Sequence, residues 1–224
     1  MTAPRGLVVA KAPVAGVSKT RLGSDIGMAA AADVAAAALL DTLAACTQAF
    51  GATNCHLALE GRLAEAVAGD TIARHVQHWT VFAQHQGDFG SRLAHAHLDA
   101  GPGPIVQIGM DTPQVDAGLL LEVSDTLAHH DAVLGPAEDG GWWVLALRNP
   151  SDAALLVGVP MSTPQTLRHT RDALESAGLD VGTTHTLRDV DTVADAVVVA
   201  EQVPGSRFAR AWHQARATSP GSPS

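Results

Sequence analysis

A basic loop near the N-terminus constrains the fold more than any other stretch of the sequence. It follows the apolar run Leu7–Ala10, which is typical of a buried strand, and precedes an Ala-rich segment that predicts a helix. The two lysines of the chain, Lys11 and Lys19, both lie in this loop, and Arg21 follows them. Open α/β sheets bind ligands where a strand leads into a helix, so the loop predicts a polyphosphate site. A merely solvated loop is the alternative.

Composition narrows the function classes. The formal net charge of −9 argues against a general nucleic-acid surface, which would be basic. The chain has no tyrosine, which excludes catalysis by a phenol. Cys46 and Cys55 lack the spacing of a metal site, and two free thiols suit a cytoplasmic protein. The N-terminus has no secretory pattern, and the Ala-rich stretch 28–49 contains Asp33 and Asp41, so we expect a soluble core helix and no membrane span.

Alternating apolar runs and helical patterns predict an α/β protein. We expect strands at 7–10, 54–59, 79–83, 104–109, 131–135, 142–147 and 181–187. We expect helices at 26–50, capped by Ser24 or Asp25, and at 62–68, 92–100, 116–130, 163–178 and 192–202.

The connection at 136–141 is too short for a crossover helix, so the strand at 142–147 should run antiparallel to its neighbour. The pattern therefore predicts a three-layer α/β/α sandwich around a mostly parallel sheet with one antiparallel strand. We expect a single domain over 1–216 and a disordered Ser/Pro/Gly tail over 217–224.

Acidic residues follow several of the predicted strands. Asp111 comes after the strand at 104–109, where it could hold a divalent cation or simply form an Asx turn. Glu138 and Asp139 precede Gly140 and Gly141 in a turn that suits a hairpin, a ligand site or both. The loops after the first, third and fourth strands should share the carboxyl edge of the sheet.

Three further features have a structural and a functional interpretation. Asp189 and Asp191 could join a metal site, although Asp191 also suits the cap of the last helix. Asp88 suits the cap of the helix at 92–100, and Arg92 could reach an anionic substrate. The histidines show no zinc spacing. The sequence also lacks a Walker A loop, a Gly-x-Gly-x-x-Gly fingerprint and a Gly-x-Ser-x-Gly elbow.

Six motifs in order carry a family resemblance: Lys11–Leu22, Gln86–Leu93, Ile108–Pro113, Gly135–Trp143, Ser162–Thr163 and Asp189–Thr192. With them the chain resembles a bacterial family of GT-A-fold, Rossmann-like, nucleotide-diphospho-sugar-transferase-like proteins, often described as glycosyltransferases. It is more distantly similar to guanylyltransferases acting on 2-phospholactate, phosphoenolpyruvate or the molybdenum cofactor. Met110 replaces a frequent serine of such families, and Met161 replaces an expected aromatic residue.

The resemblance implies roles for individual residues. It implies nucleotide binding by Ala10, Lys11, Gly16, Lys19, Thr20 and Arg21, and catalysis by Lys19, Arg21 and Asp111. It implies acceptor binding by Arg92, Glu138, Asp139, Gly140, Gly141, Ser162 and Thr163. It implies a Mg²⁺ (or Mn²⁺) site on Asp111 and Asp139.

Three functions remain open at this point. The first is nucleotidyl transfer from a nucleoside triphosphate to a small phosphorylated acceptor, favoured because a Lys/Arg loop suits a triphosphate. The second is glycosyl transfer from a nucleotide-sugar. The third is a nucleotide-binding module without catalysis. In each case the expected partners are small molecules rather than nucleic acid.

Overall fold

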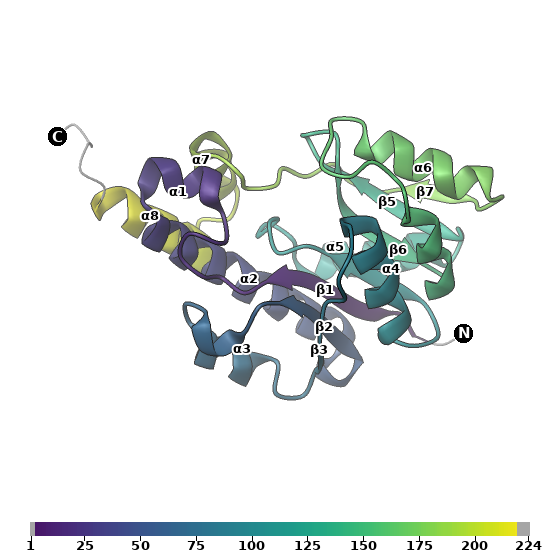
Figure 1. The fold of residues 1–224 in the computed structure, drawn as a ribbon, viewed down its shortest axis with the longest axis horizontal. Coiled ribbons are helices and arrows are strands. Elements are labelled where there is room, and N and C mark those ends of the chain that lie inside the picture. Colours follow the sequence, from purple (N-terminus) through teal and green to yellow (C-terminus); the bar gives the residue numbers. More distant parts are fainter. Residues whose placement is uncertain (1–2, 219–224) are drawn as a thin grey trace.

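A seven-stranded sheet with helices on both faces forms the molecule (Figure 1). The computed structural model describes residues 3–218, so the part of the expected tail at 219–224 lies outside the described residues. The strand order is β3-β2-β1-β4-β6-β5-β7. The strands are β1 (Arg5–Lys11), β2 (Cys55–Glu60), β3 (Thr80–Ala83), β4 (Ile105–Ile108), β5 (Ala132–Pro136), β6 (Trp142–Leu147) and β7 (Val181–Thr183).

Strand direction in the sheet confirms the sequence-based expectation. Strands β1, β2, β3 and β4 are parallel, and β6 runs antiparallel to both of its neighbours, β4 and β5. Strand β7 is parallel to β5, which in turn points the same way as β4. The six parallel strands therefore all end at one edge of the sheet, where β6 begins. Loops from six connections meet there.

Eight α-helices and three short 3₁₀ turns surround the sheet in the described residues 3–218. The helices are α1 (Thr20–Ile26), α2 (Met28–Phe50), α3 (Gly69–His75), α4 (Phe89–Asp99), α5 (Ala117–Leu127), α6 (Thr166–Ser176), α7 (Val193–Gln202) and α8 (Arg207–Thr218). The 3₁₀ turns are η1 (Ala52–Asn54), η2 (Leu63–Glu65) and η3 (Pro150–Leu156). Helices α2, α3 and α5 pack on one face and α4, η3 and α6 on the other, while α1, α7 and α8 gather on α2 (Figure 1).

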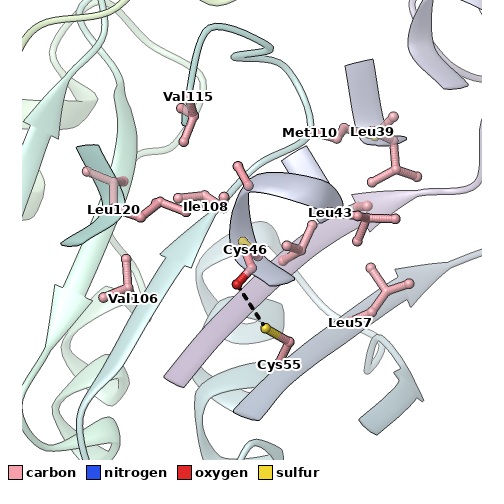
Figure 2. Close-up of a cluster of buried hydrophobic side chains, with 14 of the residues drawn as sticks. Leu39, Leu43, Cys46, Cys55, Leu57, Val106, Ile108, Met110, Val115 and Leu120 are labelled. Atoms are coloured by element: carbon pink, nitrogen blue, oxygen red, sulfur yellow. Dashed lines mark hydrogen bonds between the residues drawn. The ribbon is translucent and has the colours of Figure 1, made fainter. Parts of the chain in front are cut away.

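The core between α2 and the sheet is aliphatic. Figure 2 shows Leu39 and Leu43 of α2 beside Leu57 of β2, all of them buried. The two cysteines belong to this core, where the Cys55 thiol donates to the Cys46 carbonyl over 3.4 Å. Burial raises the pKa of Cys55 to about 12 and that of Cys46 well above its usual value, so both thiols stay neutral and pack as apolar groups.

Helix α2 is long and apolar enough to cross a membrane by length and composition, but 72% of its most apolar window is buried inside the protein. Sheet strands, α5 and α8 cover it from several sides. A mostly buried helix of this kind is explained by its place in the core, as the sequence predicts.

Several helix boundaries differ from the prediction. The expected helix at 26–50 corresponds to α2, whose cap is Gly27, with φ of +91°, rather than Ser24 or Asp25. Those two residues lie in α1, a separate helix that begins at Thr20 inside the basic loop. Gly69 and Asp70 begin α3 instead of ending a helix, since Ala68 adopts a left-handed turn before them. Helix α8 was not expected and runs to Thr218, past the boundary at 216.

Two of the expected helix N-caps are wrong, and two others are confirmed. Thr163 and Pro164 do not begin α6, which starts at Thr166 after a turn in which Ser162 has φ of +58°. Thr192, rather than Asp191, caps α7, in a reciprocal capping box with Asp195. The expected caps Asp88 and Asp116 are confirmed, since each accepts from the backbone of the first helical turn.

Candidate functional site

Two adjoining cavities lie at the edge where the parallel strands end. The first, of about 360 Å³, is called here the basic cavity and is lined by Val9, Ala10, Lys11, Val17, Ser18, Lys19, Thr20, Arg21, Glu60, Gln84, Phe89, Arg92, Gly109, Met110, Asp111 and Asp191. The second, of about 200 Å³, is called the aspartate-lined cavity and is lined by Val9, Phe89, Gln107, Gly109, Asp111, Thr112, Ala137, Asp139, Gly141, Trp142, Trp143, Met161, Ser162, Thr163, Thr166 and Asp189. Asp111 belongs to both.

Lys19 is the central cation of the basic cavity. Its Nζ lies 2.9 Å from Asp111 Oδ1 and 2.8 Å from Asp191 Oδ1, and its side chain is only 8% exposed. Burial by itself would lower the pKa of Lys19, but the charges and hydrogen bonds of the two carboxylates outweigh it and raise the pKa. The ammonium therefore stays charged at the point where the two cavities meet.

A second cluster of charged side chains, centred on Glu60, lines the same cavity. Its carboxylate accepts from Arg92 Nη1 over 2.7 Å and lies 3.3 Å from Lys11 Nζ. Arg92 also donates to Gln84 over 3.1 Å, and its guanidinium lies 5.2 Å from the centre of the Phe89 ring. Sequence reasoning missed Glu60. The signal was its position at the end of β2, directly beside Lys11 in the parallel register.

Arg21 differs from the other cations because its side chain is 79% exposed. It reaches Asp191 over 3.4 Å, a contact that water weakens. Lys11, Lys19, Arg21 and Arg92 thus place four cations against the carboxylates of Glu60, Asp111 and Asp191. The formal net charge of the residues that line this cavity is therefore positive, although the formal net charge of the whole chain is −9.

The aspartate-lined cavity has the opposite charge. Asp111, Asp139 and Asp189 line it, and no lysine or arginine is among its lining residues. The Asp139 carboxylate accepts from the Gly141 backbone over 2.7 Å. The pKa of Asp189 rises to about 6, first because burial disfavours its charged form and then because Asp139 and Asp191 add negative charge nearby. A further negative charge is therefore unfavourable in this cavity.

The structure divides the sequence-predicted residues between the two cavities. Ala10, Lys11, Lys19, Thr20, Arg21 and Arg92 line the basic cavity, and Asp139, Gly141, Ser162 and Thr163 line the other. Three expected residues line neither: Gly16, Glu138 and Gly140. Gly16 forms a turn with φ of +77°, and the Glu138 carboxylate pairs with Arg188. Four residues that line the cavities were not proposed as site residues from the sequence: Gln84, Gln107, Trp142 and Trp143.

Gly140 has a structural role that explains its place in the turn. Its φ is +90°, and a Cβ there would lie 2.1 Å from the Pro164 carbonyl oxygen. Its own carbonyl accepts from the Leu167 backbone over 2.9 Å, which joins the turn after β5 to the start of α6. Gly140 therefore holds the segment with Ser162 and Thr163 against the aspartate-lined cavity.

Gly140→Ala is expected to lower the free energy of unfolding by about 2 kcal/mol or more, because it combines a strained backbone with a steric clash. In a chain of this length that corresponds to a fall in melting temperature of roughly 4–8 °C. The matched control is Gly178→Ala, where φ is +86° but no atom lies within 4 Å of the new Cβ. An equal fall in both variants would contradict the role of the Pro164 contact.

The raised pKa of Asp189 gives stability a defined dependence on pH. Its usual value is 3.8 and its folded value about 6, so the charged form opposes folding fully above about pH 6 and not below pH 4. After allowance for partial exposure, Asp189→Asn should stabilise the metal-free protein at pH 7.5 by about 1 kcal/mol, or roughly 2–4 °C. The gain should shrink towards pH 4.5. Thermal melts in EDTA at both pH values test it, with exposed Asp172→Asn as the control.

Carboxylate oxygens suited to a divalent cation line the aspartate-lined cavity. Mg²⁺ is usually held by one or two carboxylates together with substrate phosphates. Asp111 and Asp139 line one cavity and could supply these carboxylates. Among residues 3–218 no group of three or more His, Cys, Asp or Glu side chains is arranged to hold a metal ion. Asp111 and Asp139 would therefore supply only part of a cation's ligand set.

Comparison with solved structures identifies the fold. A protein from Desulfovibrio desulfuricans G20, assigned provisionally as a nucleotide-diphospho-sugar transferase, is 26% identical, with a TM-score of 0.78 over 96% of this chain and 95% of that chain. The 4-diphosphocytidyl-2C-methyl-D-erythritol synthase of Anaerococcus prevotii DSM 20548 is 10% identical, with a TM-score of 0.58 over 90% and 99%. Rv0371c of Mycobacterium tuberculosis H37Rv, solved with manganese, is 17% identical, with a TM-score of 0.52 over 90% and 100%.

The last two similarities are below 25% identity and show the fold alone. Together with the first, they define the class: an α/β domain with the fold of the nucleotide-diphospho-sugar and nucleotidyl transferases. Comparison with curated proteins finds no match. The chain belongs to the bacterial family described as uncharacterized protein conserved in bacteria (DUF2064), whose profile matches residues 42–163. The resemblance drawn from the motifs is confirmed for family and fold.

Proposed function

We propose that this protein is a divalent-metal-dependent transferase that binds a nucleotide through its phosphates in the basic cavity. The transferred group then passes across Asp111 to an acceptor in the aspartate-lined cavity. The observation that carries the proposal is the arrangement of two cavities with opposite charge that share the Asp111 wall. The fold of the D. desulfuricans protein, matched over 96% of this chain, supports the assignment.

The nucleotide phosphates would contact the loop after β1. Lys19 is buried and positioned by two carboxylates, so it can offer a preorganised ammonium to the transferring phosphoryl group, and exposed Arg21 can close over it. Ala10 and Lys11 at the end of β1 and Thr20 in the loop complete the proposed nucleotide site, and Gly16 forms the turn between them. Catalysis then rests on positioning and electrostatics rather than on a covalent nucleophile.

Asp111 and Asp139 would hold the Mg²⁺ or Mn²⁺ ion. When bound, such an ion neutralises charge that develops on the phosphate oxygens. The manganese in the Rv0371c structure supports a divalent cation for proteins of this fold. This chain's own contribution is to hold two carboxylates beside the basic cavity and to keep Lys19 within 2.9 Å of one of them.

The leading form of the reaction is nucleotidyl transfer. An acceptor oxygen attacks the α-phosphorus of a nucleoside triphosphate, and pyrophosphate leaves. The four cations around the basic cavity support a triphosphate as the donor. Asp139, Gly141, Ser162 and Thr163 would contact the acceptor, and Arg92 would bind an anionic group of a substrate from the side of the basic cavity. Glu138 has no part in this proposal, because its carboxylate is paired with Arg188 away from both cavities.

Glycosyl transfer is the second candidate, and one observation favours it. The aspartate-lined cavity has no lysine or arginine in its lining, which suits a hydroxyl acceptor better than a phosphorylated one. A nucleotide-sugar would then place its diphosphate in the basic cavity. The leaving group distinguishes the two reactions, because the first releases pyrophosphate and the second a nucleoside diphosphate.

A thermal-shift panel of the four nucleoside triphosphates and of nucleotide-sugars, each with Mg²⁺ or EDTA, tests donor binding. A ligand at 100 times its Kd should add about 2.7 kcal/mol to stability, a clear shift in melting temperature. Donors that bind are then assayed for pyrophosphate and for nucleoside diphosphate. Binding without Mg²⁺ dependence or turnover would indicate a non-catalytic module. Absence of any shift would contradict the proposed donor site.

A further inference from the structure

A buried polar pair lies behind the aspartate-lined cavity. Gln107 of β4 is 2% exposed and lines that cavity, while Val106 and Ile108 on either side point into the opposite core. Its carbonyl oxygen is fully buried without a hydrogen-bond partner among the described residues. His97 of α4 is completely buried, and neither of its ring nitrogens has a partner in the part of the chain that the structure describes.

The two side chains lie close together in the fold. Burial lowers the pKa of His97 to about 4, and the neighbouring Gln107 side chain acts in the opposite direction. His97 is therefore neutral at pH 7. Gln107 lines the cavity with a buried carbonyl oxygen that has no partner among the described residues. Such an amide is satisfied when a ligand group both donates to its oxygen and accepts from its N–H₂.

The charge of the cavity restricts that ligand. Three carboxylates line it and no lysine or arginine does, and within residues 3–218 only one of the three, Asp111, is paired with a cation, Lys19 of the basic cavity. The four cations of the basic cavity lie around the other side of Asp111. A second phosphate in the aspartate-lined cavity would meet carboxylates at close range, whereas a hydroxyl group can donate to them and accept from Gln107.

The apolar part of the lining fits the same class of ligand. The indole N–H of Trp142 donates to Thr170 over 3.2 Å and that of Trp143 to the His185 carbonyl over 2.8 Å. Both tryptophans therefore offer apolar ring surface rather than hydrogen bonds. Ring surface beside carboxylates and hydroxyls suits a molecule that has C–H faces and several hydroxyl groups.

From this geometry we propose that the aspartate-lined cavity takes an uncharged, polyhydroxylated acceptor, and that Gln107 is the residue that recognises its hydroxyl group. The inference rests on the proposed function and replaces its phosphorylated acceptor. The acceptor oxygen bonds to the transferred group, the donor releases pyrophosphate or nucleoside diphosphate, and the hydroxyl proton passes to water.

A matched pair of probes, D-glucose and D-glucose 6-phosphate, tests the acceptor class. The pair is titrated into ¹⁵N-labelled protein, and the side-chain amide of Gln107 and the indole N–H groups of Trp142 and Trp143 are followed by NMR. We expect D-glucose to shift these signals at millimolar concentration and D-glucose 6-phosphate to need at least tenfold more. Equal or stronger response to the phosphate, or no response to either sugar, overturns the proposal.

Gln107→Leu tests the residue itself. It should weaken D-glucose binding at the indole signals about tenfold, while exposed Gln77→Leu leaves it unchanged. Gln107→Asn, which keeps the amide but shortens it, covers the case in which the leucine variant does not fold. Unchanged binding in a folded Gln107 variant overturns the assignment. Nucleoside triphosphate binding, measured on the same samples, reports on the basic cavity, so failure of the proposed function is recognised separately.

Discussion

Lys19→Ala is expected to weaken binding of a nucleoside triphosphate with Mg²⁺ by about 10- to 100-fold. A hydrogen bond from a charged donor contributes about 1.5–3 kcal/mol, and Lys19 is the most buried cation of the basic cavity. Isothermal titration of parent and variant with the triphosphate measures the change. The melting temperature should fall little, because the side chains of Asp111 and Asp191 are 42% and 38% exposed and water can solvate them.

Arg62→Ala is the control for Lys19→Ala. Arg62 is also a cation in an ion pair, 3.4 Å from Glu65, but it lines neither cavity and its side chain is 76% exposed. The Arg62→Ala variant should bind the triphosphate with the affinity of the parent. If folded Lys19→Ala bound the triphosphate as tightly as the parent, the main support for a phosphate site in the loop after β1 would be lost.

Asp111→Asn is expected to reduce Mg²⁺-dependent turnover at least about 100-fold, a loss of roughly 3 kcal/mol in transition-state stabilisation. Asparagine has the same shape, but it is neutral and a weak ligand for Mg²⁺. The fold should persist, since Lys19 keeps its contact with Asp191. Steady-state rates across a Mg²⁺ titration, with the donor found in the thermal-shift panel, measure the effect.

Asp116→Asn is matched to Asp111→Asn in chemistry and in position along the chain. Asp116 caps α5 and lies outside both cavities, and asparagine is an equally good cap. Its rate and Mg²⁺ dependence should equal those of the parent. If Asp111→Asn kept the parental Mg²⁺ dependence, the cation would have to be held elsewhere.

Local signals in the sequence sufficed for much of the fold. The short connection at 136–141 correctly predicts that β6 is antiparallel, because no crossover helix fits there. Asp88 and Asp116 correctly predict helix starts, because a cap depends only on residues within one turn. Helix α1 was missed, since its seven residues are too few for a clear helical periodicity, and Ser24 and Asp25 within it were interpreted as caps of the next helix.

The site was less accessible from sequence because its contacts are long-range. The ion pair of Lys19 with Asp191 joins residues that are 172 positions apart, and local reasoning assigned Asp191 to a helix cap. The division of charge between two cavities required the register of β1 with β2, which brings Glu60 beside Lys11. His97 and Gln107 each look unremarkable in the sequence, and only their shared burial makes them informative.

The position of Lys19 on Asp111 has a consequence for the order in which ligands enter. The ammonium lies 2.9 Å from one oxygen of the Asp111 carboxylate, so a metal ion bound alone at the proposed site would compete with it for this ligand. In the proposed complex, nucleotide phosphates would attract the same ammonium and weaken its hold on Asp111. Metal and nucleotide should therefore bind with positive cooperativity, and thermodynamic linkage requires each to raise the affinity of the other by an equal factor. Titrating each ligand with and without the other would measure that factor twice, from opposite sides.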